Sequence, residues 1–168
     1  MVGTRTSFAG MDCAIAQAIE QVGDAWTLLL LRALFQGLKR FDDFQGHLGM
    51  SSSVLSDRLA RLMTAGLIRK EKDHRDARAC VYLLTDKGLD FYPVLIALNQ
   101  WGERWEGKPD GMRLDLIERA SGRPVREVQV LSQDYKVLTA RDVEARPGPG
   151  AGAVYEDVQE RVRRRQVQ

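Results

Sequence analysis

The sequence predicts a mainly α fold with a small β wing, followed by a small β-containing C-terminal extension. Apolar residues recur at helical spacing between residues 12 and 65, two short β-prone runs follow, and a second helical pattern occupies residues 85–105. Beyond residue 107 the chain turns to glycine, proline and short valine-rich runs. We therefore divide it into an arm (1–11), an α-rich domain with its wing (12–106), an extension (107–146) and a linker with a polar helical tail (147–168).

Helix start and stop signals set the order of the first helices. A first helix opens near Asp12 and carries apolar residues at helical spacing up to Val22. Asp24 can cap a second helix over Ala25–Phe35 because its carboxylate can accept a hydrogen bond from the free amides of the first turn. Gly37 is placed to end that helix.

A helix, a tight turn and a second helix follow. The first begins near Arg40 and ends at Gly49, which makes the turn. The serine run 51–53 offers a hydroxyl cap for the next helix, which Gly66 ends. Its leucines and Met63 fall on one side, and small or charged residues fall on the other.

The remaining elements form the wing, a long helix and the extension. Two strands at 68–72 and 80–84 enclose the loop 73–78, and a helix runs from Thr85 to about Trp105. Pro93 either kinks that helix or marks a break between two helices. In the extension we expect a strand at 125–131 with a partner at 135–138, and in the tail a polar helix at 154–168.

The composition of the chain limits the ligands that it can bind and the compartment in which it can function. The net charge is only +2, so binding to a polyanion requires a local basic patch. Residues 39–78 provide a modest one, with nine basic and six acidic side chains. No apolar run reaches membrane-spanning length, no signal peptide opens the chain, and two cysteines make no disulfide framework. These features predict a cytoplasmic protein that does not enter a membrane.

The helix-turn-helix followed by a basic hairpin is the pattern of a winged helix-turn-helix that binds double-stranded DNA. The second helix would enter the major groove, the hairpin would reach a minor groove, and one basic residue would contact phosphate before the turn. The alternatives are an amphipathic surface helix and a solvated hairpin tip. The candidate DNA-binding residues are Arg40, Ser52, Ser53, Ser56, Arg58, Arg61, Arg75 and Arg78.

Other chemistry-bearing residues each have two interpretations. Cys13 lies near a helix start, where the helix dipole favours a thiolate, so it is a redox-sensor candidate or a small buried residue. Trp26, Trp101 and Trp105 could line a pocket for an aromatic effector, or pack in the core or a dimer interface. No nucleophile lies beside a base and no metal-ligand set is visible, so we predict no enzyme, metal or cofactor.

Residues 12–101 resemble the HxlR-type winged helix-turn-helix regulators. The resemblance rests on the combined spacing of Cys13, Val22-Gly23-Asp24, Trp26-Thr27-Leu28-Leu29, Arg32, Gly37, Arg40-Phe41, Leu48-Gly49-Met50-Ser51, Leu55, Arg58-Leu59, Leu62, Gly66-Leu67, Tyr82-Leu83-Leu84-Thr85 and Gly88. It implies a bacterial homodimer that joins through its first and last helices and places one recognition helix in each half-site. Some redox-sensing members use the cysteine that Cys13 matches.

Two departures from that family stand out. The loop 73–78 looks more like the wing of MarR-type regulators than the usual proline-containing HxlR wing. The stretch 116–150 is similar to a zinc-ribbon-like module, but the ligand positions are occupied by Glu118, Ser121, Leu131 and Asp134. Because leucine cannot bind zinc and the thiolates are gone, we expect a degenerate module without metal. Such a module could serve dimerisation or shape an effector pocket.

The sequence therefore favours a homodimeric transcriptional regulator, most simply a repressor, that binds a pseudo-palindromic operator. A small molecule, such as an aromatic effector, or oxidation would control it. The alternative is a ligand-binding or protein-interaction module that uses a winged-helix scaffold without specific DNA binding. That alternative predicts no salt-dependent affinity for DNA.

Overall fold

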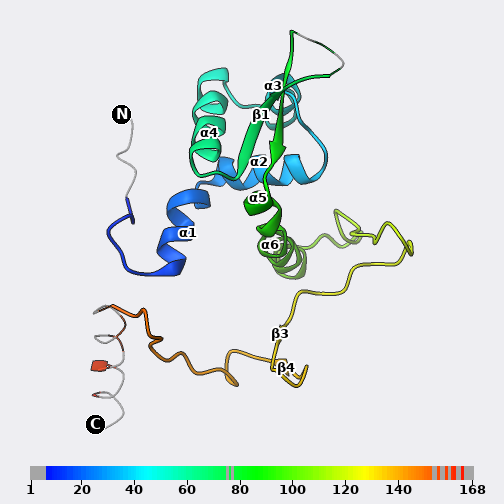
Figure 1. Ribbon diagram of the computed structural model, residues 1–168. Coiled ribbons are helices and arrows are strands. Elements are labelled where there is room, and N and C mark those ends of the chain that lie inside the picture. The colour runs from blue at the N-terminus through cyan, green and yellow to red at the C-terminus, as the bar shows by residue number, and fades with distance from the viewer. Residues whose placement is uncertain are drawn as a thin grey trace.

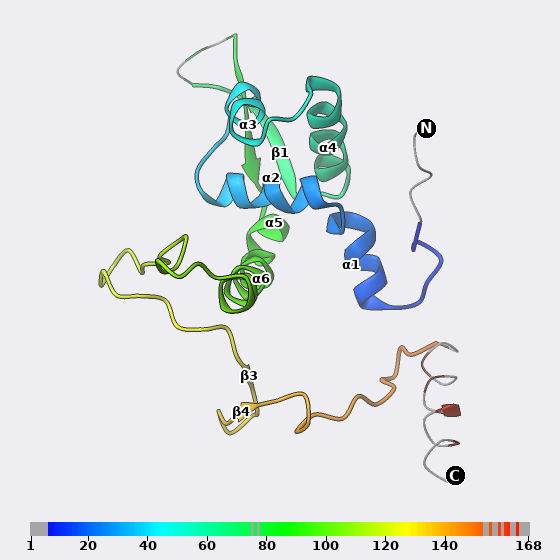
Figure 2. The ribbon, with the colours of Figure 1, turned by 180° about the vertical axis from the view of Figure 1, so that it is seen from behind.

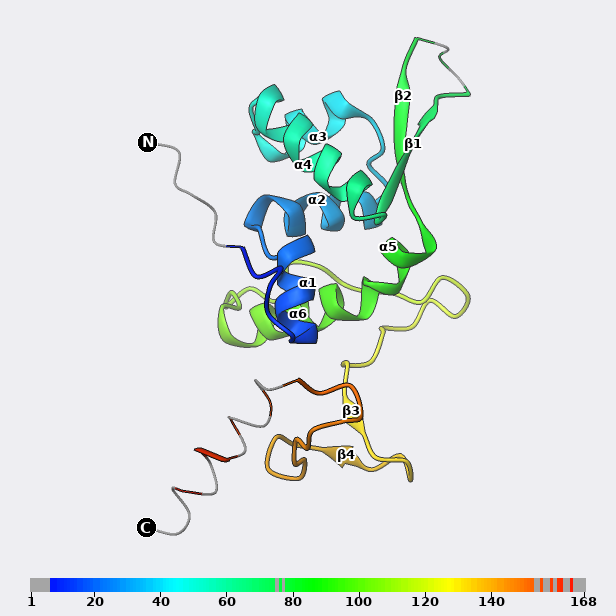
Figure 3. The same cartoon turned by 60° about the vertical axis from the view of Figure 1, so that its left-hand side comes forward.

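The computed structural model describes residues 7–74, 76, 78–152, 155, 158, 160–161 and 164. Two ends are distinguishable in it (Figures 1 and 2). The helix-turn-helix and the wing strands lie at one end, and the first helix, the sixth helix and residues 130–152 lie at the other (Figure 3). No described helix is long and apolar enough to cross a bilayer.

Four helices precede the wing, and their bounds follow the predicted signals closely. They are α1 (Ala14–Val22), α2 (Ala25–Phe35), α3 (Phe41–Leu48) and α4 (Ser52–Thr64). The Asp24 side chain accepts a hydrogen bond from the Thr27 amide at 3.2 Å and so caps α2 as expected. Gly49 ends α3 with φ 66°, a left-handed conformation that lets the chain turn sharply into α4.

The wing is an antiparallel pair of strands, β1 (Ile68–Lys72) and β2 (Cys80–Leu84), with Ile68 opposite Leu84. The segment before α3 joins this sheet, because the Tyr82 amide donates to the Lys39 carbonyl at 2.8 Å. The wing is therefore attached directly to the start of the helix-turn-helix.

The core lies between α2, α3, α4 and the wing. Leu30, Leu31, Phe44, Leu55 and Leu62 are fully buried within it. Burial of a large apolar side chain contributes roughly 1.5–3 kcal/mol, so this cluster dominates the stability of the helix-turn-helix. The apolar side of α4 thus faces inward, as its pattern predicts.

The long helix predicted over 85–105 is two helices. They are α5 (Asp86–Asp90) and α6 (Tyr92–Trp105), with Phe91 between them. Pro93 lies in the first turn of α6, where its missing N–H leaves no helical hydrogen bond unmade. Of the two alternatives for Pro93, the structure shows the break.

The extension contains far less regular structure than its valines suggested. Its strands are β3 (Val130–Leu131) and β4 (Val137–Leu138), paired antiparallel, so the strand expected at 125–131 is confirmed only at its end. Residues 155, 158, 160, 161 and 164 are helical, and the rest of the helix expected at 154–168 lies outside the described residues, as do residues 1–6 of the predicted arm.

Candidate nucleic-acid interface

The start of α4 is held by two polar contacts. The Ser51 hydroxyl accepts a hydrogen bond from the Val54 amide at 3.4 Å and caps the helix. The Gln45 side-chain amide on α3 donates to the Ser52 hydroxyl at 2.9 Å. Both contacts fix α4 relative to the turn, so its outer face is presented in a defined orientation.

The outer face of α4 is exposed and consists largely of small polar side chains. Three of the predicted contact residues, Ser52, Ser53 and Ser56, lie on it. Ala60 and Thr64 continue the same exposed row. Because these side chains are short, the backbone of α4 could approach a DNA groove closely. The serine and threonine hydroxyls could then contact base edges.

Arg58, which the sequence also predicts to contact DNA, is only partly exposed and is not one of the residues of this exposed row. Its side chain is only 20% exposed and turns back towards the start of α2. Its Nε and Nη2 donate to the two carboxylate oxygens of Asp24 at 2.8 and 3.1 Å. A bidentate guanidinium–carboxylate contact is rigid, so Arg58 positions α4 on α2.

Asp24 therefore has two functions, of which the sequence revealed one. It caps α2 and binds Arg58, which lies 34 residues later. Burial alone would raise the pKa of the Asp24 carboxyl, but hydrogen bonds from Arg58 and the Thr27 amide outweigh burial and lower the pKa. The sequence has no local signal for this contact, because Asp24 is the cap before α2 and Arg58 lies in α4.

Arg61 remains at the surface of α4. Its Nε donates to Asp57 one turn earlier at 2.9 Å, and its side chain is 46% exposed. Exposed pairs of this kind contribute little stability, so phosphate could replace Asp57 as the partner at small cost. Arg61 thus lies on the exposed side of α4, as the helical pattern of the sequence predicts.

Arg40 connects the helix-turn-helix to the wing. Its Nε donates to Asp73 at 2.9 Å, its Nη2 also contacts that carboxylate, and its side chain is 43% exposed. The hydrogen bond to Asp73 raises the pKa of the Arg40 guanidinium. Arg40 was predicted to contact phosphate, and in the free chain it first fixes the base of the wing loop.

Two backbone amides make hydrogen bonds among the described residues of the wing loop. The Asp73 amide donates to the Ala79 carbonyl at 3.0 Å, and the Arg78 amide donates to the Asp76 carboxylate at 3.0 Å. The Arg78 residue is exposed at the tip. Arg75, the other predicted wing contact, lies outside the described residues.

Comparisons with known proteins identify this arrangement. Residues 21–110 match the family model described as HxlR-like helix-turn-helix, which covers the α2–α6 region and more than half of the chain. The chain belongs to the HxlR-like helix-turn-helix family. This is the family that its sequence pattern resembles, and its relatives are named as transcriptional regulators rather than enzymes.

Similarity to relatives extends beyond the HxlR-like region. The HTH-type transcriptional regulator Rv3095 of Mycobacterium tuberculosis is 33% identical over 82% of this chain and 87% of its own length. The solved structure of PA1607, assigned as a transcription factor, is 36% identical, with TM-score 0.79, over 85% of this chain and all of that chain. PA1374 of Pseudomonas aeruginosa is 34% identical, with TM-score 0.59, over 87% of this chain and 99% of that chain.

Cys13 lies at the N-terminal end of α1 in this HxlR-like chain and is partly buried. Hydrogen bonds from the Ala16 backbone, the Tyr155 side chain and the Ile15 backbone lower the pKa of the Cys13 thiol. A lower pKa increases the thiolate fraction at neutral pH, and the thiolate is the reactive form. The other cysteine, Cys80, is on β2.

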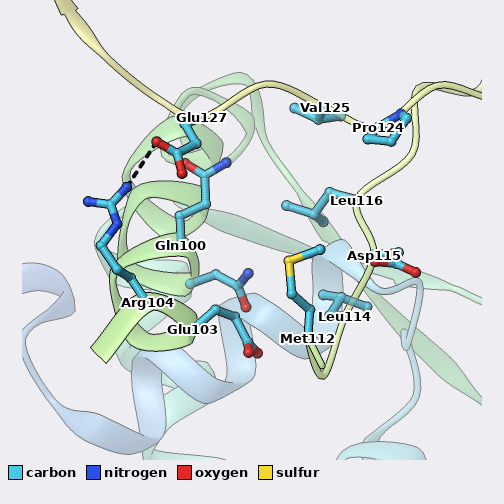
Figure 4. Close-up of a pocket in the computed structure, with 11 residues that line it drawn as sticks. Gln100, Glu103, Arg104, Met112, Leu114, Asp115, Leu116, Pro124, Val125 and Glu127 are labelled. Carbon is cyan, nitrogen blue, oxygen red and sulfur yellow. Dashed lines mark hydrogen bonds and ion pairs between the residues drawn. The ribbon is translucent and has the colours of Figure 1, made fainter. Parts of the chain in front are cut away.

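One cavity of the described residues is lined by α6 and the extension and does not include the tryptophans. It has a volume of about 410 Å³ and lies between α6 and the extended segment 112–127 (Figure 4). Side chains such as Met112 and Leu116 form its apolar wall, and polar side chains of α6, including Asn99, form the other. Trp26, Trp101 and Trp105 are 37%, 58% and 68% exposed, and none of them is among the residues lining this cavity.

The four positions compared with zinc ligands form no metal site in the described part of the chain. Glu118 and Ser121 contact each other within one tight turn. Leu131 is on β3 and Asp134 is in the turn that follows. No three histidine, cysteine or acidic side chains among the described residues gather closely enough to hold a metal.

Proposed function

We propose that this HxlR-like chain is a homodimeric repressor that binds a pseudo-palindromic operator through one α4 helix per half-site. The observation that carries the proposal is the outer face of α4, which is exposed, made of small polar residues and held in place by the Asp24–Arg58 contact. Ser52, Ser53, Ser56 and Arg61 would meet bases or phosphates in the major groove. Arg40 would contact phosphate through the exposed part of its side chain.

Exposed apolar residues on the two terminal helices support the homodimer. Ile15 on α1 is 71% exposed, and Leu98 and Trp101 on α6 are also exposed. Side chains of this size are rarely left in water as a group in a monomer. Trp101 and Trp105 therefore fit a dimer interface better than an effector pocket.

Repression by this protein would follow from occupation of its operator. The direct test measures binding to the intergenic DNA upstream of its own gene across a salt series. We expect specific affinity that falls steeply with salt, because phosphate contacts release counterions. Affinity no greater than for unrelated DNA of equal length at every salt concentration would favour the alternative, a winged-helix module without specific DNA binding.

The contribution of the wing to DNA binding can be tested separately in the same assay. Replacement of Arg78 by alanine should weaken binding to specific and unrelated DNA by a similar factor, about 3- to 10-fold, and reduce the salt slope by about one. Lys108→Ala, at an exposed position after α6, is the matched control and should change neither quantity. An unaltered salt slope in the Arg78 variant would remove the wing from the interface, and Arg75→Ala extends the test to the second predicted wing residue.

An effector would act by changing the relative orientation of the two α4 helices, each of which would bind one half-site of the operator. The cavity of Figure 4 supports a small molecule with an apolar side and a polar side, because its two walls differ in this way. Its position against α6 places it next to the proposed dimer helix. A ligand there could therefore alter how the two subunits meet.

Oxidation of Cys13 is the second candidate for control. Peroxide would convert the thiolate to a sulfenic acid, transferring one peroxide oxygen to sulfur and releasing hydroxide, which takes up a proton to give water. We expect operator affinity to fall after peroxide treatment, and the Cys13→Ser variant to keep its affinity. Cys80→Ser is the control and should remain sensitive. Equal sensitivity of wild type and Cys13→Ser would exclude Cys13 as the switch.

A further inference from the structure

The extension is attached to α6 at its near end. The Gln100 side chain donates to the Arg126 carbonyl at 3.2 Å and accepts from the Val128 amide at 2.7 Å. Arg104 on the next turn of α6 contacts Glu127 at 2.9 Å. Three neighbouring residues of the extension are therefore held along one face of α6.

The linker that follows the extension returns to the start of α1. The backbone at Gly152 lies so close to the Asp12 carboxylate that a Cβ at Gly152 would collide with it. Arg146, Gly148, Gly150 and Ala151 line a common cavity with Asp12 and Ala14. The extension and the start of the linker thus form a strap, residues 107–152, that leaves α6 and ends beside α1.

The middle of this strap, residues 129–146, buries almost nothing in its own chain. Every residue in it is exposed except Ser132 and Leu138, which are partly buried. Five large apolar side chains are exposed by 47–85%: Val130, Leu131, Tyr135, Val137 and Val143. Two-residue strands do not offset the conformational entropy of ordering such a segment.

The strap runs along the end of the molecule that carries α1 and α6, and away from α4 and the wing (Figures 1 and 3). That end also has exposed apolar side chains on its helices, including Ile15, Trp101 and Trp105. The chain therefore holds two unpaired apolar surfaces on one side. Neither covers the other within a single subunit.

We propose that the strap of each subunit embraces a second copy of this chain and covers apolar residues of the partner subunit's α1 and α6. The exchange is reciprocal, as twofold symmetry requires, and it rests on the homodimer proposed above. It assigns a function to the extension, most of which lies outside the region that matches the family. It also leaves the α4 and wing surfaces of both subunits open to DNA.

Three observations favour a second copy as the occupant. The apolar side chains of the strap and terminal helices expose surface on the order of the 800 Å² per partner that a stable interface buries. Residues 129–146 contain three acidic and three basic residues, so the strap has no positive excess that would favour nucleic acid or an anionic membrane. The matches to Rv3095 and PA1607 cover more of the chain than residues 21–110, so those proteins share part of the extension.

The first test is the double variant Leu131→Asp and Val137→Asp, two paired residues on one face of the β3–β4 hairpin, in the full chain, with the dimer dissociation constant measured by sedimentation. We expect that constant to rise at least about tenfold, because two carboxylates would be buried against apolar residues. Lys136→Asp, an exposed position in the same hairpin, is the matched control and should change it less than about threefold. A double variant that dimerises like the control would overturn the proposal.

The second test distinguishes a strap that binds the partner subunit from a strap that folds back onto its own subunit. A photo-crosslinking amino acid replaces Val137 in an epitope-tagged chain, which is then mixed with untagged wild type. We expect covalent tagged–untagged dimers with crosslinks to α1 or α6 of the untagged chain. Crosslinks only within one chain, or only to added anionic phosphatidylserine vesicles, would overturn the strap exchange while leaving the α1–α6 dimer intact. A monomeric wild type would instead overturn the homodimer itself.

Discussion

Replacement of Ser56 by glutamate is expected to weaken specific DNA binding at least about 100-fold while leaving the fold unchanged. Ser56 lies in the middle of the exposed face of α4, between the serines at its start and Arg61. A carboxylate there faces phosphates and base acceptors, and it removes a hydroxyl that can bind a base edge. Because glutamate is a good helix former at an exposed position, the free energy of unfolding should stay within about 0.5 kcal/mol.

The measurement is fluorescence anisotropy with an operator fragment, together with urea unfolding of the same preparations. Gln36→Glu adds the same charge at an exposed position beyond the end of α2 and is the matched control. Its affinity should fall less than about threefold. If the Ser56 variant binds as tightly as this control, α4 does not enter the groove, and the proposed function loses its main support.

Local signals in the sequence were sufficient to predict most of the helix-turn-helix. Asp24 before α2, the serine run before α4 and Gly49 after α3 act on backbone groups within a few residues, so their effects can be read without knowledge of the fold. The leucine pattern of α4 identified its inner side for the same reason. The HxlR-like family match confirmed the resulting fold class.

The orientation of Arg58 could not be predicted in this way. Its place at the border of the α4 stripe allows its side chain to turn outward or inward, and the choice depends on Asp24, which is far away in the sequence. Pro93 posed a similar problem, since a kink and a break have the same local signal. In the extension, valines predicted a longer strand than β3, but a strand needs a partner, and only Leu138 and Val137 pair with it.

Replacement of Asp24 by alanine should destabilise the chain by about 2–4 kcal/mol at pH 7. Loss of the α2 cap accounts for roughly 1 kcal/mol. The rest follows because Arg58, only 20% exposed, loses its bidentate partner. Asp57→Ala removes a more exposed partner of the same Arg58 guanidinium and should cost less than about 1 kcal/mol, which makes it the matched control.

The pH dependence of unfolding identifies the carboxylate as the cause. The pKa of Asp24 is lowered in the folded chain, so its stabilisation is fully present above the ordinary pKa of an aspartate, about 3.9. That stabilisation is lost as the pH falls through the lower folded value, and the difference between wild type and Asp24→Ala should therefore shrink in acid. Asp24→Asn, which keeps a capping side chain, should lie between the two at pH 7. Urea unfolding at pH 7 and near pH 3 measures the free energy of unfolding of the wild type and both variants. If the difference between wild type and Asp24→Ala does not depend on pH, the charge of Asp24 does not hold Arg58 and α4 in place.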